Sequence, residues 1–270
     1  MELKKREFPE PIEALIVILV SFGIIFATAI IITAVALFLQ KNSVMDGNTP
    51  LLFIIGGLFF LVIPVFYARI RNYNIHRVFR LNPVPSIILL LGIPIGMSLA
   101  ILTDVLDRIM RIILPPPDMF TQYLESMRAE TMTDWVLLIM GVVLIAALSE
   151  EMLFRGFLQV SLEKKGDINR AVIMTSLTWT LIHINPYWAV QIFVTGIFLG
   201  FIAWRTGSIY PSMIVHGTNN LLSLLSINFD FENNVDWYFW GDFVSPFIVL
   251  LALVILITSI RYLSIRYQTH

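Results

Sequence analysis

The chain has 270 residues, of which 57% are hydrophobic and only 14% are charged, and its mean hydropathy is +0.82. A soluble domain carries roughly 25% charged residues, so this composition excludes an ordinary soluble protein and indicates a multi-pass protein of the cell membrane. The net charge is −1 and there is no basic cluster, so we expect no nucleic-acid partner. The chain has no cysteine, which excludes disulfides, thiol nucleophiles and zinc sites built on cysteine.

Eight apolar segments follow one another and predict an all-α bundle of about eight transmembrane helices in a single membrane domain, residues 1–270. The first segment is too long for the core of a signal peptide, about 7–15 residues, and is interpreted as an uncleaved anchor helix. The expected spans are 14–39, 51–68, 86–103, 132–163, 171–185, 187–204, 208–227 and 243–260.

Three connecting segments have a character of their own. Residues 40–50 are expected to form a short turn. In 104–131, which contains three successive prolines, residues 104–114 form either an amphipathic helix at the membrane interface or a solvated connector. Residues 228–242 combine acidic side chains with Trp and Tyr, which is typical of an interfacial aromatic belt.

The distribution of basic residues predicts the orientation. With eight crossings and a cytosolic N-terminus, 13 of the 18 Lys and Arg residues lie in cytosolic segments and 4 in outer segments, with Arg155 inside the bundle. Because cytosolic loops of membrane proteins are enriched in Lys and Arg, we expect both ends of the chain in the cytosol.

Two adjacent carboxylates, Glu150 and Glu151, occur near the end of the fourth span. Charged groups at this depth are costly and usually functional. Glu151 and Arg155 are one helical turn apart and share a face, whereas Glu150 points roughly 140° away from Arg155. Arg155 is therefore expected to neutralise Glu151 and to leave Glu150 unpaired, as a general base requires. The alternative is a charge cluster at a helix end, with Arg155 extending to the cytosol.

Three further polar residues, His183, His216 and Asn220, lie within later spans. At about 1.5 Å per residue, Glu150, His183 and Asn220 each lie roughly 18 Å from the cytosolic end of their helices, and His216 roughly 12 Å. For each residue alone, an interhelical hydrogen bond is the simpler interpretation. Their common depth favours a shared site. Trp179, one turn before His183, is expected to pack in the core or against lipid.

These residue types favour a site that activates water. Glu150, helped by His183, would take a proton from water, and His216 and Asn220 would donate to the developing oxyanion. A zinc site with His and Glu ligands, as in a metallopeptidase, remains an alternative. A proton-coupled transporter, in which Glu150, His183 and His216 relay protons, is a second alternative, although no internal repeat supports it. A non-catalytic scaffold or immunity protein is a third.

The same residues resemble the CAAX protease and bacteriocin-processing (CPBP, or Abi) family of intramembrane glutamic endopeptidases, which includes type II CAAX prenyl proteases. That family carries Glu-Glu-x-x-x-Arg, then Phe-x-x-x-His, then His-x-x-x-Asn/Asp on successive helices. The first motif is intact at Glu150, Glu151 and Arg155, and the third is intact at His216 and Asn220. In the second motif His183 is present, but Trp179 replaces the usual Phe.

The resemblance covers about residues 130–225, the expected catalytic core, and implies peptide-bond hydrolysis without an obligatory metal. It implies catalytic roles for Glu150, Glu151, His183, His216 and Asn220, with Arg155 and Trp179 in support. The implied partners are the lipid bilayer and a peptide or protein substrate. Members of the family process prenylated CAAX tails or peptide precursors, so the resemblance leaves the need for a prenyl group open.

Overall fold

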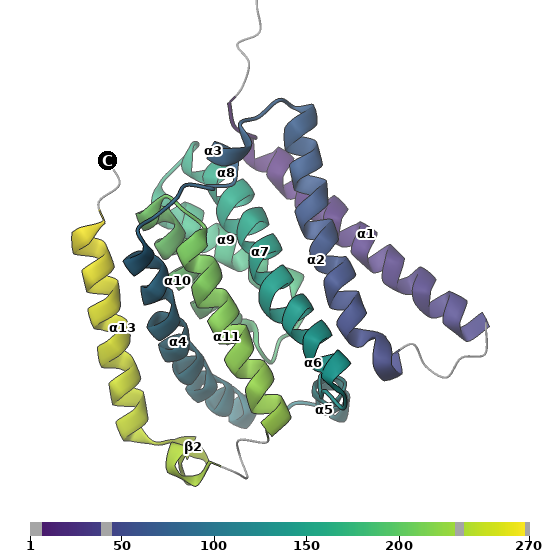
Figure 1. Cartoon of the computed structure of the whole chain (residues 1–270), viewed down its shortest axis with the longest axis vertical. Helices are drawn as coiled ribbons and strands as arrows, with labels where there is room; N and C mark the ends of the chain where they lie inside the picture. Colours follow the sequence, from purple (N-terminus) through teal and green to yellow (C-terminus); the bar gives the residue numbers. More distant parts are fainter. Residues whose placement is uncertain (1–6, 39–44, 230–234, 268–270) are drawn as a thin grey trace, which may run out of the picture.

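The computed structural model of the chain describes residues 7–38, 45–229 and 235–267, and these residues form one bundle of helices with a single small hairpin (Figure 1). The all-α prediction is therefore confirmed. The first five helices are α1 (Pro11–Phe38), α2 (Met45–Ile70), α3 (Ile75–Val78), α4 (Ser86–Ile113) and α5 (Asp118–Glu125).

The fourth predicted span is one long helix with two π-helical segments, in which the backbone is wound more loosely. Its parts are α6 (Met132–Leu138), η1 (Ile139–Ile145), α7 (Ala146–Glu150), η2 (Glu151–Leu158) and α8 (Gln159–Glu163). A capping box between Thr131 and Asp134 starts this helix. The two π segments flank Glu150, and π segments within helices occur frequently at functional sites.

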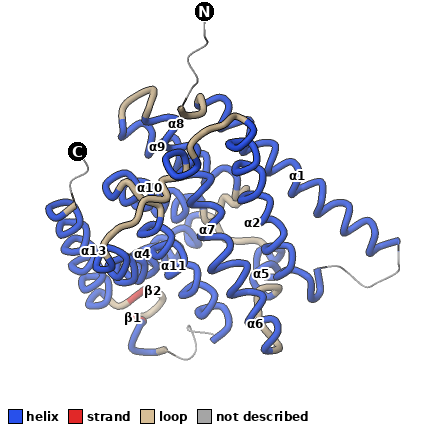
Figure 2. The backbone as a smooth tube through the Cα atoms, turned by 45° about the horizontal axis from the view of Figure 1, so that its top comes forward, coloured by secondary structure: helices blue, strands red, loops and turns tan. Residues whose placement is uncertain are grey.

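The remaining elements pack around this central helix. They are α9 (Ile168–Ile182), α10 (Ala189–Thr206), α11 (Tyr210–Phe229), the short 3₁₀ turn η3 (Asp236–Tyr238), β1 (Phe239–Trp240), β2 (Phe243–Val244) and α13 (Pro246–Arg266). Asp167 caps the start of α9 with its side chain, and Gly207, with φ of 62°, ends α10 in the left-handed conformation that glycine tolerates. Figure 2 shows the hairpin at one end of the bundle, beside the start of α13.

Six helices of the described residues are long and apolar enough to cross a membrane. They coincide with predicted spans one to four, six and eight, which confirms a multi-pass membrane protein. The other two predicted spans correspond to α9, which has only 15 residues, and α11, which carries His216 and Asn220. The number of crossings and the cytosolic position of the ends therefore stay predictions.

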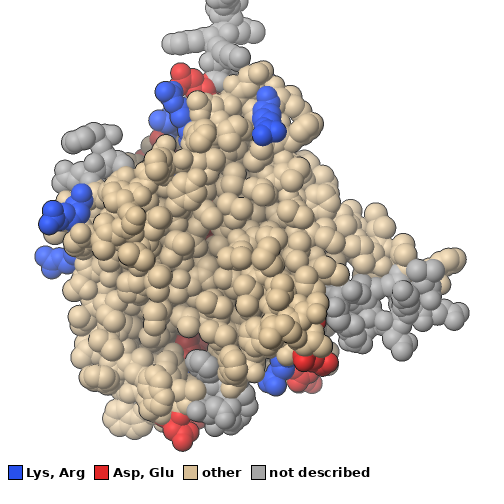
Figure 3. Space-filling model, in the orientation of Figure 1, with Lys and Arg blue, Asp and Glu red and all other residues tan. Residues whose placement is uncertain are grey.

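The surface agrees with a membrane position. On the face shown in Figure 3, charged side chains lie at the top, at the left edge and at the bottom, and the broad area between them is uncharged. The start of α1 and the end of α13 lie at the same end (Figure 1).

Two predicted boundaries differ from the structure. Residues 45–50, predicted as part of a turn, belong to α2, while 39–44 lie outside the described residues. Residues 104–113 are neither a separate interfacial helix nor a connector, because α4 continues through them. Their polar side chains have partners: the hydroxyl of Tyr238 donates to Asp104, and Arg108 donates to the backbone of Asp242. Residues in and next to the hairpin thus bond to the polar side chains in this last part of α4.

The aromatic segment 228–242 is described except for 230–234, and its largest side chains are exposed as a belt requires. Trp237 is 75% exposed and Trp240 is 73% exposed. Its role as an interfacial belt stays a prediction.

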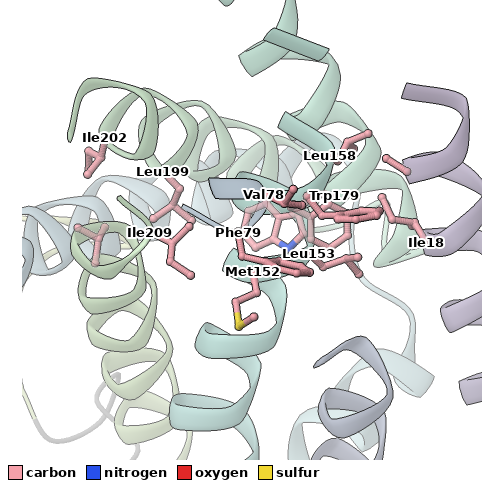
Figure 4. Close-up of a cluster of buried hydrophobic side chains, with 14 of the residues drawn as sticks. Ile18, Val78, Phe79, Met152, Leu153, Leu158, Trp179, Leu199, Ile202 and Ile209 are labelled. Carbon is pink, nitrogen blue, oxygen red and sulfur yellow. The ribbon is translucent and has the colours of Figure 1, made fainter. Parts of the chain in front are cut away.

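Close helix contacts position the site. A Cβ on Gly196 would lie 2.9 Å from Cβ of Ser176, and a Cβ on Gly200 would lie 3.0 Å from the side chains of Gln159 and Val172. These two glycines allow the helices to approach closely, whereas Gly217 has only ordinary contacts, the nearest at 3.5 Å. Helices α9 and α10 therefore pack directly against each other and against η2. Figure 4 shows Trp179 among the buried side chains at the centre of this packing.

Candidate active site

The most deeply buried part of the site is an ion pair on η2. Glu151 and Arg155 are both 0% exposed, and Nη1 of Arg155 donates to Oε1 of Glu151 at 2.9 Å. The predicted pairing is confirmed, and the alternative of Arg155 extending to the cytosol is wrong because protein encloses the side chain. Nδ1 of His216, on α11, lies 3.0 Å from the same oxygen. An ionised carboxylate only accepts hydrogen bonds, so Nδ1 must carry a hydrogen in this arrangement.

Glu150 has a different partner on a different helix. The indole N–H of Trp179, on α9, donates to Oε2 of Glu150 at 2.6 Å. The expectation that Glu150 would be unpaired is therefore wrong, although its partner is a neutral donor and not a cation. Among the described residues no group donates to Oε1 of Glu150, so this oxygen keeps its capacity to accept a bond.

Trp179 is the residue on which the site converges. Its side chain is only 4% exposed. The guanidinium carbon of Arg155 lies 4.3 Å from the centre of the indole, and the rings of His183 and His216 stand edge-to-face to it at 5.1 and 5.4 Å. Three of the four residues predicted to share a site, Glu150, His183 and His216, thus contact one indole, whereas Asn220 bonds to the first π segment. Trp179 does pack in the core, as expected, but it also contacts Glu150, Arg155 and both histidines of the site.

His183 ends α9 and is exposed. Its Nδ1 lies 2.7 Å from the carbonyl oxygen of Trp179. Because a carbonyl only accepts, Nδ1 is the protonated nitrogen, and Nε2 of the neutral ring is then an acceptor. The next residue, Ile184, has φ of 47°, a left-handed conformation that is unfavourable for a β-branched side chain. This conformation ends the helix immediately after His183.

Asn220 lies one turn beyond His216 on α11. Its amide nitrogen Nδ2 donates to the carbonyl oxygen of Val142 at 2.9 Å, in the first π segment. This bond joins α11 to the central helix on the opposite side of Glu150 from η2. The amide retains a second hydrogen for another acceptor.

A polar network that the sequence analysis missed supports η2 from the side of α8. Gln159 donates to Glu163 and to the carbonyl of Gly200, while Arg80 donates to the carbonyl of Arg155 and pairs with Glu163. Burial lowers the pKa of Arg80, and the charge of Glu163 opposes this shift. A signal was present, since polar residues recur at every fourth position from Glu151 to Glu163. Arg80, in a loop about 75 residues earlier, gave none.

The described residues contain no group of three or more His, Asp or Glu side chains that could hold a metal ion. This finding does not support the zinc alternative, which is left to the experiment described below.

These observations define the class of protein: a multi-pass helical membrane protein with a carboxylate, imidazole and indole site where its helices meet. Residues 132–222 match the family model described as Type II CAAX prenyl endopeptidase Rce1-like. This part of the chain, which carries the three motifs, is therefore similar to that family of membrane proteases. No curated protein and no solved structure matches the chain.

Proposed function

We propose that this chain is a glutamic-type intramembrane endopeptidase that hydrolyses a peptide bond near the cytosolic half of the bilayer. The family match supports a CAAX-type membrane protease. The observation that carries the proposal is that Glu150, His183 and His216, from three helices, all contact one buried indole.

In this proposal Glu150 and His183 activate the water. Oε2 of Glu150 is held by Trp179, so Oε1 is the atom that accepts a proton from water. Nε2 of His183 accepts a hydrogen bond from the same water, because Nδ1 is already engaged with the backbone. The hydroxide attacks the carbonyl carbon of the peptide, and the proton held by Glu150 passes to the leaving amine. The reaction consumes one water and one peptide bond and gives one carboxylic acid and one amine.

His216 and Asn220 would stabilise the oxyanion of the tetrahedral intermediate. Since Nδ1 of His216 faces Glu151, its Nε2 can donate only when the ring carries both hydrogens, and Glu151 provides the counter-charge. The free N–H of Asn220 is the second donor. One donor of this kind is worth roughly 3 kcal/mol of transition-state stabilisation. Glu151 and Arg155 act by holding His216 and Trp179 in place.

The test compares membrane peptides from cells that express the wild type, Glu150→Ala or Trp204→Phe. Trp204 lies on α10, where its contacts are with Phe201 and Arg205, so its variant controls for loss of a tryptophan. We expect to find peptides that are cleaved in cells with the wild type or Trp204→Phe. The same peptides should stay uncleaved in cells with Glu150→Ala. Cleavage of the same peptides by purified Glu150→Ala at the wild-type rate would refute the proposal.

Purified protein then defines the substrate. Synthetic peptides that cover the cleaved sequence, each with and without a farnesyl group on a terminal cysteine, show whether prenylation is required. Added zinc and a zinc chelator test the metallopeptidase alternative. Proton-driven solute flux in proteoliposomes, without any peptide cleavage, would favour the transporter alternative instead.

A further inference from the structure

The geometry points to Trp179 as a positioning residue that orients both members of the water-activating pair, Glu150 through its side chain and His183 through its backbone. The inference rests on the proposed function. It concerns the one position at which this chain departs from its family's second motif, where Phe is usual.

The indole is held in one pose by its surroundings. A Cβ added to Gly196 would lie 3.2 Å from the six-membered ring of Trp179, so α10 leaves no free space on that side. The guanidinium of Arg155 lies over the ring at 4.3 Å, and Arg155 is itself fixed by its ion pair with Glu151. The ring of His216 contacts the indole edge-to-face. A donor fixed in this way imposes its direction on the carboxylate that accepts from it.

The carboxylate of Glu150 needs such a restraint. Glu150 lies on α7, directly before η2, and is only partly buried. Its N–H···O bond to Trp179, at 2.6 Å, is slightly shorter than the usual range of about 2.7–3.2 Å. A Phe ring at position 179 would fill most of the same space but could not donate. Glu150 would then rotate about its side-chain torsions, and Oε1 would no longer be held toward one water position.

The backbone of the same residue orients His183. The Trp179 carbonyl accepts from Nδ1 of His183, which selects the tautomer with a lone pair on Nε2. A side-chain change at Trp179 leaves this carbonyl in place. Substitution of the indole therefore tests the restraint on Glu150 separately from the restraint on His183.

The first experiment measures cleavage by Trp179→Phe, with Trp204→Phe as the matched control and the cleaved peptide found above as substrate. We expect kcat to fall about 10- to 100-fold, since a misplacement of about 1 Å can cost 10²-fold, while KM changes less than about threefold. Trp204→Phe should keep the wild-type kcat. In a second variant, benzothienylalanine at position 179 keeps the bicyclic shape and removes only the N–H. It should show the same loss of kcat and should fold if Trp179→Phe does not.

The second experiment needs no activity. In ¹⁵N-labelled protein in detergent micelles, the six tryptophans give six indole N–H signals, and that of Trp179 is the one missing in Trp179→Phe. We expect this signal downfield of the others, and we expect it to move upfield in Glu150→Ala and not in Trp204→Phe. If the Trp179 indole signal does not move in Glu150→Ala, the hydrogen bond between Trp179 and Glu150 is refuted.

The outcomes separate the inference from the proposed function. If the wild type cleaves, Glu150→Ala is inactive and both indole replacements keep the wild-type kcat, the positioning role is refuted and the peptidase proposal stands. If no peptide is cleaved but the Trp179 signal moves in Glu150→Ala, the peptidase proposal fails and the hydrogen bond remains.

Discussion

Replacing Arg155 by Met tests how much the buried ion pair contributes to the fold. The side chain is 0% exposed, donates to Glu151 at 2.9 Å and to the Gly196 carbonyl at 3.5 Å, and covers the indole of Trp179. Met fills a similar length of space without charge. Arg155→Met therefore leaves the Glu151 carboxylate buried with only the His216 ring and the hydroxyl of Ser212 as partners among the described residues.

The expected cost follows from this burial. Removing one partner of a buried ion pair costs about 3–5 kcal/mol, mainly because the other charge is left uncompensated. The ion pair between Arg77 and Glu7 is the matched control, since its side chains are 64% and 68% exposed. An exposed pair contributes about 0–1 kcal/mol. We therefore expect a loss of about 3–5 kcal/mol for Arg155→Met and less than about 1 kcal/mol for Arg77→Met.

The assay is reversible unfolding in detergent micelles, with the unfolding free energy measured for the wild type, Arg155→Met, Arg77→Met and the double variant Glu151→Gln/Arg155→Met. The double variant removes both charges, so it should recover part of the stability lost in Arg155→Met. A loss below about 1 kcal/mol for Arg155→Met would refute the reasoning, because it would mean that Glu151 carries no uncompensated charge. A double variant less stable than the single variant would refute it as well.

Three further predictions concern other parts of the bundle. A Cβ on Gly156 would lie 2.8 Å from the Cα of Phe79, so Gly156→Ala should lower the unfolding free energy by about 1–3 kcal/mol, whereas Gly23→Ala, with nothing within 4 Å, should not. Burial raises the pKa of Tyr123 from 10.0 to about 12. Because the raised value belongs to the folded state, stability should fall as pH rises from 10 toward 12; Tyr123→Phe should show a shallower fall, and equal slopes would contradict the prediction. Ile184→Gly should raise stability by about 1 kcal/mol, since it removes left-handed strain, and a measured loss would show that the Ile184 side chain makes a stabilising contact.

Local pattern alone predicted the spans and the Glu151–Arg155 pair. Both depend on interactions within one helix or between a helix and lipid, so hydropathy and the i, i+4 spacing suffice. The continuation of α4 was not predictable in this way. Asp104 and Arg108 look like loop residues until Tyr238 and Asp242, more than 130 positions later, provide their partners.

The site shows the same division. The rise per residue predicted a common depth for Glu150, His183 and Asn220, with His216 on a level nearer the start of its helix. In the structure the three residues that contact one indole are Glu150, His183 and His216. The bond from Trp179 to Glu150 joins residues 29 positions apart and depends on how closely α9 approaches the central helix. Gly196 on α10 lets that helix approach Ser176 and Trp179 of α9 closely, and no periodicity within a single helix predicts such a contact.

The two adjacent carboxylates have contrasting partners, and this contrast fits the proposal that Glu150 is the base and Glu151 a support. Glu151 accepts from a guanidinium and an imidazole, so its charge is used to hold Arg155 and His216 in place. Glu150 accepts only from a neutral indole. A neutral donor gives direction to a carboxylate and withdraws less of its charge than a cation would. An Arg or Lys at position 179 would orient Glu150 equally well. Its positive charge would also stabilise the ionised carboxylate and make Glu150 a weaker base toward water. Tryptophan orients Glu150 without adding a positive charge, and the face of its ring at the same time contacts Arg155.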